Sequence, residues 1–249
     1  MKIKLRKQSH EIETLLNYAD ILNHIVKCGR TCYKSELSED IIKKHSVEYD
    51  ISKKQAVKEL NEDFIRRIPI GKGHETLLEH FSFTVRFVTN RGCSHELVRH
   101  RISSFSQEST RYVNYNNKGM EFIIPSWLSI PVGTYELYKK LSNMEWSLRG
   151  KDGEIDVDYN EWNWLSCIGE FTGTYNELLG MGQRPEQARG VLPNDLKTEI
   201  VCTSNLRQWR TIFKQRAINK AAHPQMRELM LPLLDELKET LPVFFEDIV

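Results

Sequence analysis

The stretch FSFTVRFVT, residues 81–89, constrains the fold more than any other part of the sequence. Its apolar side chains alternate with mostly polar ones, which is the period of a strand with one buried face. The buried side is predicted to hold Phe81, Phe83, Val85 and Phe87, and the other side Ser82, Thr84 and Arg86. A second strand is predicted over MEFIIP, residues 120–125, where Pro125 ends it. The fold therefore contains a small sheet.

Most of the remaining chain follows a helical period, with apolar residues recurring at spacings of three and four. Long helices are predicted over residues 11–27, 53–68, 135–149, 160–180, 205–220 and 225–240. Shorter ones are predicted from His74 or Glu75, over PEQARGVL, and over CSHELVRHRISS. A loop is expected over 149–156, and a kink at Pro232. The fold class is α+β, a mostly helical chain around a small sheet.

Composition narrows the class of protein. The 249 residues are 40% hydrophobic and 28% charged, which suits a globular chain with a real core. We find no internal repeat and no low-complexity linker, so a single domain over residues 1–249 is expected. The formal net charge of +1 argues against a general binder of polyanions.

The five cysteines show no CxxC spacing, so neither a disulfide framework nor a zinc site is predicted. Cys93 and Cys202 also lack the histidine and asparagine pattern of a cysteine nucleophile. No apolar run reaches the length of a signal peptide or a membrane span. A cytoplasmic protein with reduced thiols and no membrane segment is expected.

The segment RHRISSFSQESTRY, residues 99–112, is called the basic segment here. It places Arg99, Arg101 and Arg111 among short hydroxyl side chains, a combination suited to binding phosphate. A solvated charged loop is the alternative. His100 lies between two arginines, which disfavours its charged form. We expect a neutral group that hydrogen-bonds or stacks.

Arg216 is the second unusual position. On a helical wheel of residues 205–220 it falls in the middle of an apolar face, where an unpaired charge would be costly. That face consists of Leu206, Trp209, Ile212, Phe213 and Ala217. Two interpretations stay open: an internal salt bridge, or an arginine that reaches an anionic ligand in a pocket.

The remaining motifs do not match a known metal-binding or nucleotide-binding signature. His74 and His80 in GHETLLEH do not have the HExxH spacing, and positive charge around His95 and His100 opposes a cation, so no metal is expected. GMGQRPEQARGVLP lacks both the dinucleotide-binding and the P-loop signatures.

Several motifs in series nevertheless resemble one family, the flavin-dependent thymidylate synthases. Arg99-His100-Arg101 is followed, after seven intervening residues, by Ser109. The motifs GHETLLEHFSFTVRF, STRY, EQARGVLP and NLRQWRTIFKQR also occur in the family's order, and together they span most of residues 71–227.

The resemblance implies a fold, a reaction and an assembly. The fold is mostly helical around a small, mainly antiparallel sheet. The reaction makes dTMP from dUMP, with methylenetetrahydrofolate giving the carbon unit, FAD reduced by NADPH giving the hydride, and no covalent enzyme nucleophile. The assembly is a homotetramer with FAD at subunit junctions. Nucleic acid is not an expected partner.

The resemblance also implies site residues. Arg216 matches the arginine that ionises N3 of the uracil ring. The positions matched to dUMP binding are Glu96, Leu97, Val98, Arg99, Gln107, Glu108, Ser109, Thr110, Arg111, Arg189 and Arg216. Those matched to FAD binding are Thr76, Arg99, His100, Arg101, Gln107, Asn205, Leu206, Arg207 and Thr211. Glu96 stands where glutamine is frequent in the family, and His223 receives no flavin role.

Two alternatives remain at this point. A nucleic-acid-binding module would use the basic segment, with Tyr112 and Tyr115 for base stacking, against which the near-zero net charge weighs. A flavin protein without synthase activity, such as an NADPH oxidase or a regulator, would keep the binding residues.

Overall fold

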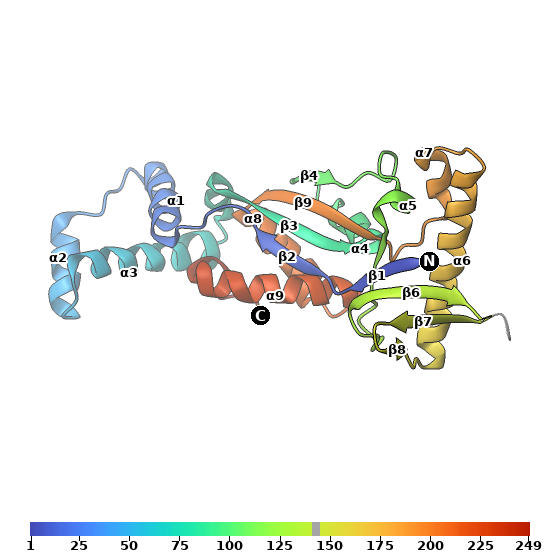
Figure 1. Ribbon diagram of the computed structural model, residues 1–249. Coiled ribbons are helices and arrows are strands. Elements are labelled where there is room, and N and C mark those ends of the chain that lie inside the picture. The colour runs from blue at the N-terminus through green and yellow to red at the C-terminus, as the bar shows by residue number, and fades with distance from the viewer. Residues whose placement is uncertain (141–144) are drawn as a thin grey trace. The chain divides into compact units, whose positions relative to one another are not determined.

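A computed structural model describes residues 1–140 and 145–249 (Figure 1). The chain forms two compact units, each assembled from several segments. The first unit consists of Met1–Glu11, Arg86–Arg99 and Phe105–Cys202. The second unit consists of Ile12–Val85, His100–Ser104 and Thr203–Val249. The expectation of a single domain over residues 1–249 stays a prediction.

The first unit contains a five-stranded sheet of order β5-β1-β6-β7-β8. β1 pairs in parallel with β5, and the pairs β1–β6, β6–β7 and β7–β8 are antiparallel. The strands are β1 (Lys2–Arg6), β5 (Met120–Ile123), β6 (Gly133–Lys139), β7 (Trp146–Gly150) and β8 (Gly153–Glu154). Helix α6 (Tyr159–Gly180) packs against β7. The mostly antiparallel pairing agrees with the expected sheet.

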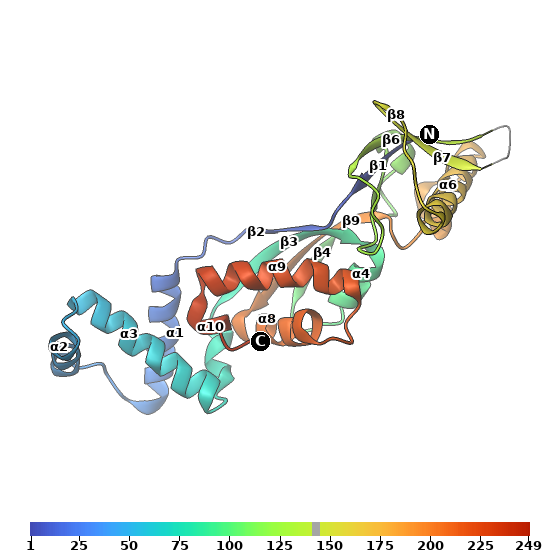
Figure 2. The same cartoon turned by 90° about the horizontal axis from the view of Figure 1, so that it is seen from below.

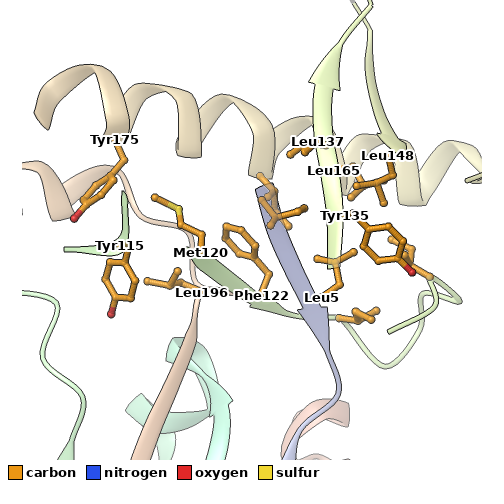
Figure 3. Close-up of a cluster of buried hydrophobic side chains, with 14 of the residues drawn as sticks. Leu5, Tyr115, Met120, Phe122, Tyr135, Leu137, Leu148, Leu165, Tyr175 and Leu196 are labelled. Atoms are coloured by element: carbon orange, nitrogen blue, oxygen red, sulfur yellow. The ribbon is translucent and has the colours of Figure 1, made fainter. Parts of the chain in front are cut away.

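The core of this unit lies between the sheet and α6 (Figure 3). Leu5, Phe122, Leu137, Leu148 and Leu165 are all fully buried in it. Helix α6 begins with a capping box: the Asp158 carboxylate accepts from the Glu161 amide, and the Glu161 carboxylate accepts from the Asp158 amide. The short helices of the unit are α4 (Arg91–Leu97), α5 (Tyr115–Lys118) and α7 (Pro185–Ala188).

A second sheet, of order β2-β3-β9-β4, has strands that contribute residues to both units. They are β2 (Ser9–Ile12), β3 (Ser82–Asn90), β9 (Lys197–Asn205) and β4 (Ser104–Gln107). The predicted strand over 81–89 is confirmed as β3, and Phe83, Val85 and Phe87 are buried while Ser82 is exposed. The predicted strand over 120–125 is confirmed as β5.

Helices dominate the second unit, where α1 and α2 both pack on α3 (Figure 2). Asn17, Ser38 and Ser52 cap α1, α2 and α3 through side-chain oxygens. The α-helices are α1 (Tyr18–Tyr33), α2 (Glu39–Glu48), α3 (Lys53–Ile65), α8 (Leu206–Phe213), α9 (Pro224–Thr240) and α10 (Pro242–Phe245). A 3₁₀ turn spans Glu75–His80, and π-helical turns span Arg66–Gly71 and Lys214–Ile218.

Several expected helices agree with the structure. The helix over 53–68 becomes α3 and the π-helical turn after it, that over 160–180 becomes α6, and that over 205–220 becomes α8 and its π-helical turn. The short helices from Glu75 and over PEQARGVL are also present. α9 continues through Pro232, so the kink there stays a prediction.

Other expectations are wrong. The helix over 135–149 is replaced by β6 and β7, because Tyr135 and Leu137 alternate with exposed residues, although positions 141–144 lie outside the described residues. The helix over 11–27 begins only at Tyr18, because residues 9–12 pair as β2. The helix over CSHELVRHRISS ends at Leu97, and β4 occupies part of the basic segment.

The loop expected over 149–156 contains the turn between β7 and β8, where Gly153 adopts a positive φ of 124° that suits glycine. Among the described residues, no helix combines the length and the apolar character needed to cross a bilayer.

Candidate active site

The turn of residues 108–111 follows β4 and carries four of the positions matched to dUMP. Its backbone is closed by hydrogen bonds from the amides of Tyr112 and Val113 to the Ser109 carbonyl, at 3.2 and 3.1 Å. The Ser109 hydroxyl accepts from the Arg111 amide at 3.3 Å. The short side chain thus bonds its own backbone, as serine often does in turns.

Two guanidinium groups lie around this turn in the first unit. Arg189, in the turn after α7, donates to the Thr110 hydroxyl at 3.4 Å, and Thr110 is buried. Arg111 lies 3.8 Å from a Glu186 carboxylate oxygen and keeps about half of its side chain exposed. The structure therefore brings Thr110, Arg111 and Arg189 together, a set of hydroxyl and forked donors able to bind a phosphate.

Gln107, the last residue of β4, is held in place by two hydroxyl groups. Its amide nitrogen donates to the hydroxyls of Ser94 and Thr198 at 2.8 and 3.1 Å, and both partners are buried. The orientation of this amide is thus set before any ligand arrives.

The Glu108 carboxylate is already bonded within the protein. It accepts from Lys197 Nζ and from the Tyr115 hydroxyl, each at 2.9 Å. Lys197 also donates to Glu199 at 2.6 Å. These side chains line a pocket of about 650 Å³ whose walls also include Arg86 and Glu121.

The positions on and after α4 have different exposures. The Leu97 side chain is fully buried, so it belongs to the core and only its backbone can meet a ligand. Glu96 and Val98 are half-buried, and Arg99 is exposed just after the helix.

In the second unit, the side chains of His100 and Arg216 form a hydrogen-bonded pair. Arg216 Nε donates to His100 Nε2 at 3.1 Å. His100 is only 6% exposed, and burial, followed by the charge of Arg216, lowers its pKa to about 4. The imidazole is therefore neutral near pH 7, with Nε2 as acceptor and the proton on Nδ1. The expectation of an uncharged, hydrogen-bonding His100 is confirmed.

The predicted apolar face of the 205–220 helix is fully buried, but Arg216 is not in its middle. Arg216 is half-buried, because it lies in a π-helical turn over Lys214–Ile218, where the helical period differs from that of the α-helix before it. The buried arginine of this helix is Arg210, 1% exposed, which the sequence did not single out. It donates to both carboxylate oxygens of Asp247 at 2.7 Å.

The remaining positions matched to FAD in the second unit lie at the N-cap of α8 and along it, on the 3₁₀ turn, and directly after His100. Asn205 caps α8 by accepting from the Gln208 amide at 2.8 Å, and the Leu206 side chain is buried. Arg207 donates to Glu79 at 2.6 Å and lies 3.7 Å from Glu75. Thr76 and Arg101 are exposed, and the Thr211 hydroxyl donates to the Arg207 carbonyl.

None of the five cysteines forms a disulfide. Cys93 and Cys202 are buried, and all five cysteines are free. Within residues 1–140 and 145–249, no three histidine, cysteine or carboxylate side chains gather as a metal ion would need.

Comparison with known proteins assigns the family. A family model described as thymidylate synthase complementing protein matches residues 14–243. Among curated relatives, the flavin-dependent thymidylate synthase of Corynebacterium efficiens is 36% identical over 190 residues, which cover 75% of this chain and 69% of the relative. The chain belongs to the flavin-dependent thymidylate synthase family. The enzyme of that name from Pyrococcus abyssi is 32% identical over 189 residues, 74% of this chain, and the match spans just under two thirds of its length, 66%.

A solved structure supports the fold of this flavin-dependent thymidylate synthase family member. Thymidylate synthase X from Helicobacter pylori, crystallised with FAD and dUMP, superposes with a TM-score of 0.63 at 22% identity. The superposition covers 97% of this chain and 98% of the other. The α+β class predicted from the sequence is confirmed.

Lys197 bonds to Glu108 and Asp247 bonds to the buried Arg210, yet the sequence did not single out either of them. Tyr115, which also bonds to Glu108, was predicted only as a stacking residue of the nucleic-acid alternative. For Lys197 a signal exists: KTEIVCTSN, residues 197–205, alternates, and Thr198, Ile200, Cys202 and Ser204 are buried. Polar residues at buried positions conceal this period in a simple apolar pattern.

Proposed function

We propose that this chain is a thymidylate synthase that converts dUMP to dTMP by reductive methylation, with methylenetetrahydrofolate as the carbon donor. FAD, reduced by NADPH, would supply the hydride. Family membership supports this class of reaction. The observation that carries the proposal is the hydrogen bond from Arg216 to an uncharged, buried His100.

Arg216 would act at N3 of the uracil ring. Its Nε is held by His100, which fixes the plane of the guanidinium. A fixed cation stabilises the anion that forms when N3 loses its proton, with most effect where water is excluded. Since His100 is neutral, it orients this cation without adding a second charge.

The turn of residues 108–111 would bind the nucleotide. Arg111 and Arg189 supply forked donors for the phosphate, and the hydroxyls of Ser109 and Thr110 supply single ones. Glu96, Val98, Arg99 and Gln107 stay proposed contacts with dUMP, and Leu97 would contribute through its backbone.

The residues matched to FAD suit a flavin dinucleotide because of their donor chemistry. The diphosphate is an anion, and the exposed Arg99, Arg101 and Arg207 carry the charge to hold it. The other proposed contacts are Thr76, His100, Gln107, Asn205, Leu206 and Thr211.

No enzyme nucleophile is part of the proposal. Cys93 and Cys202 are buried, and the role assigned to Arg216 is electrostatic. We place the reaction in the cytoplasm and the enzyme in a homotetramer with FAD at subunit junctions.

The visible absorption spectrum of the purified protein tests the proposal. Flavin bands should bleach on adding NADPH, faster when dUMP is present, and dTMP should form once methylenetetrahydrofolate is added. A protein that cannot be loaded with FAD, or that oxidises NADPH without making dTMP, would contradict it. Tight RNA binding without flavin would favour a nucleic-acid-binding role of the basic segment instead.

A further inference from the structure

The start of the 108–111 turn is anchored to β9 by both backbone and side chain. The Glu108 amide donates to the Glu199 carbonyl at 2.9 Å. The Glu108 carboxylate accepts from Lys197, also on β9, and from Tyr115 beyond the turn. Glu108 therefore ties the start of the turn to β9 and to Tyr115, the first residue of α5.

The charges in this cluster are enclosed. The side chains of Lys197 and Glu108 are only 12% and 18% exposed, and Glu199 is 38% exposed. Burial alone would lower the pKa of Lys197, but its bonds to Glu199 and Glu108 outweigh burial and raise it. Burial, together with the Glu108 charge, raises the pKa of Tyr115, so its hydroxyl stays a donor.

This geometry leaves Glu108 little capacity for a nucleotide. Its carboxylate bonds an ammonium and a hydroxyl, and a carboxylate facing a phosphate would add like-charge repulsion. The turn that Glu108 anchors, by contrast, carries Thr110 and Arg111, beside Arg189.

We propose that Glu108 is a positioning residue, not a ligand of dUMP: Lys197 and Tyr115 hold its carboxylate, and through it they fix the turn that presents Ser109, Thr110 and Arg111. The proposal rests on the proposed function of this turn. It gives Lys197 and Tyr115 a role and reassigns Glu108, which the family resemblance matches to dUMP binding.

A double-variant cycle separates positioning from direct contact. Glu108→Ala, Lys197→Met and the double variant are compared with the wild type for dUMP binding by calorimetry and for dTMP formation. Each single change should raise the dissociation constant and KM for dUMP about tenfold, with kcat at saturating dUMP nearly unchanged. The dissociation constant of the double variant for dUMP should be no higher than that of the single variant that binds dUMP less tightly, because both changes break the same ion pair between Glu108 and Lys197.

A milder substitution and a control substitution test the same positioning role. Glu108→Gln keeps an acceptor for Tyr115 but loses the charge that Lys197 needs, so it should weaken dUMP binding less than Glu108→Ala. Lys139→Met, which removes the exposed pair with Glu170 in the same unit, is the matched control and should bind dUMP normally.

Two outcomes would overturn the positioning role while leaving the proposed function intact. Additive losses in the double variant would show that Glu108 contacts dUMP by itself, and a Glu108→Ala variant with unchanged dUMP affinity would show that the cluster does not position the turn. A wild-type protein that neither binds dUMP nor makes dTMP would overturn both.

Discussion

At the scale of single residues, the proposed chemistry of the site depends on Arg216 being charged and His100 being neutral. His100 and Arg216 lie 116 positions apart in the sequence and share one hydrogen bond, in which the histidine must be neutral to accept. Arg216 can then stay a cation beside it without charge repulsion.

Replacing Arg216 tests its role most directly. Arg216→Ala should lower kcat for dTMP formation by about 10²–10³-fold, since a fixed cation at the developing charge is lost. Circular dichroism and the melting temperature should stay close to the wild type, and Gln215→Ala, an exposed neighbour, should retain normal turnover. Normal turnover in Arg216→Ala would exclude the proposed chemistry.

The lowered pKa of His100 predicts a pH dependence of stability. Between about pH 6.5 and 4 the unfolded chain binds a proton at this histidine that the folded chain does not, so stability falls as pH falls. From pH 7 to 5 this amounts to about 2 kcal/mol of unfolding free energy. Urea unfolding of wild type and His100→Gln at both pH values measures it. The variant should lose about that much less, and equal losses in the two proteins would contradict the assignment.

At the scale of elements, close packing places strict limits on α6. A Cβ added at Gly169 would lie 2.5 Å from the Trp146 ring, whereas one added at Gly173, a turn later, would meet nothing within 4 Å. Two glycines of one helix therefore differ in what substitution does.

Alanine substitutions at these positions should have opposite signs. Gly169→Ala should lower the free energy of unfolding by about 1–3 kcal/mol through overpacking. Gly173→Ala should raise it by about 0.5–1 kcal/mol, because alanine favours the helix. Denaturant titration measures both, and a stabilised Gly169→Ala would show that Trp146 does not pack as described.

The end of the chain is tied to α8 through the buried Arg210. Asp247→Ala removes both short bonds between that arginine and a carboxylate, leaving it Glu75 at 3.8 Å, and should lower the unfolding free energy by about 3 kcal/mol. Glu246→Gln removes the neighbouring, exposed pair with Arg66 and should change it by less than about 1 kcal/mol. Similar effects from the two substitutions in thermal and urea melts would contradict the buried character of the Arg210 pair.

The sequence predicts an element well when residues close together in the chain determine it, and poorly when pairing with a distant strand does. β3 and the helix from Asn205 were predictable because Phe83, Val85 and Phe87, and Trp209 and Phe213, set a period within a few residues. β4 was not predictable, since pairing with another strand makes a polar segment that includes Ser104 extended. β9 alternates, but polar residues at its buried positions, such as Thr198, conceal the period.

The same distinction holds for the site. Motif order identified Thr110, Arg111, Arg189 and Arg216 as candidates. Their partners follow from the fold alone, because no local pattern links Glu108 to Lys197, 89 positions later. The depth of Arg216 was also wrong for a local reason, a π-helical turn that apolar spacing does not reveal.

At the scale of the whole molecule, the proposed assembly makes a measurable prediction. A tetramer of this 29.2 kDa chain has a mass of 4 × 29.2, about 117 kDa. Light scattering during size-exclusion chromatography should give that mass, and FAD should be lost together with the tetramer on dilution if several chains hold each flavin. A monomer that keeps FAD would contradict the shared site.

The division into two units limits what recombination between related genes can exchange. The chain passes from one unit to the other after residues 11, 85, 99, 104 and 202, and one passage falls inside the Arg99-His100-Arg101 motif itself. A single crossover between related genes would therefore give a hybrid in which at least one unit is drawn from two parents. No single crossover can exchange one whole unit and leave the other unmixed.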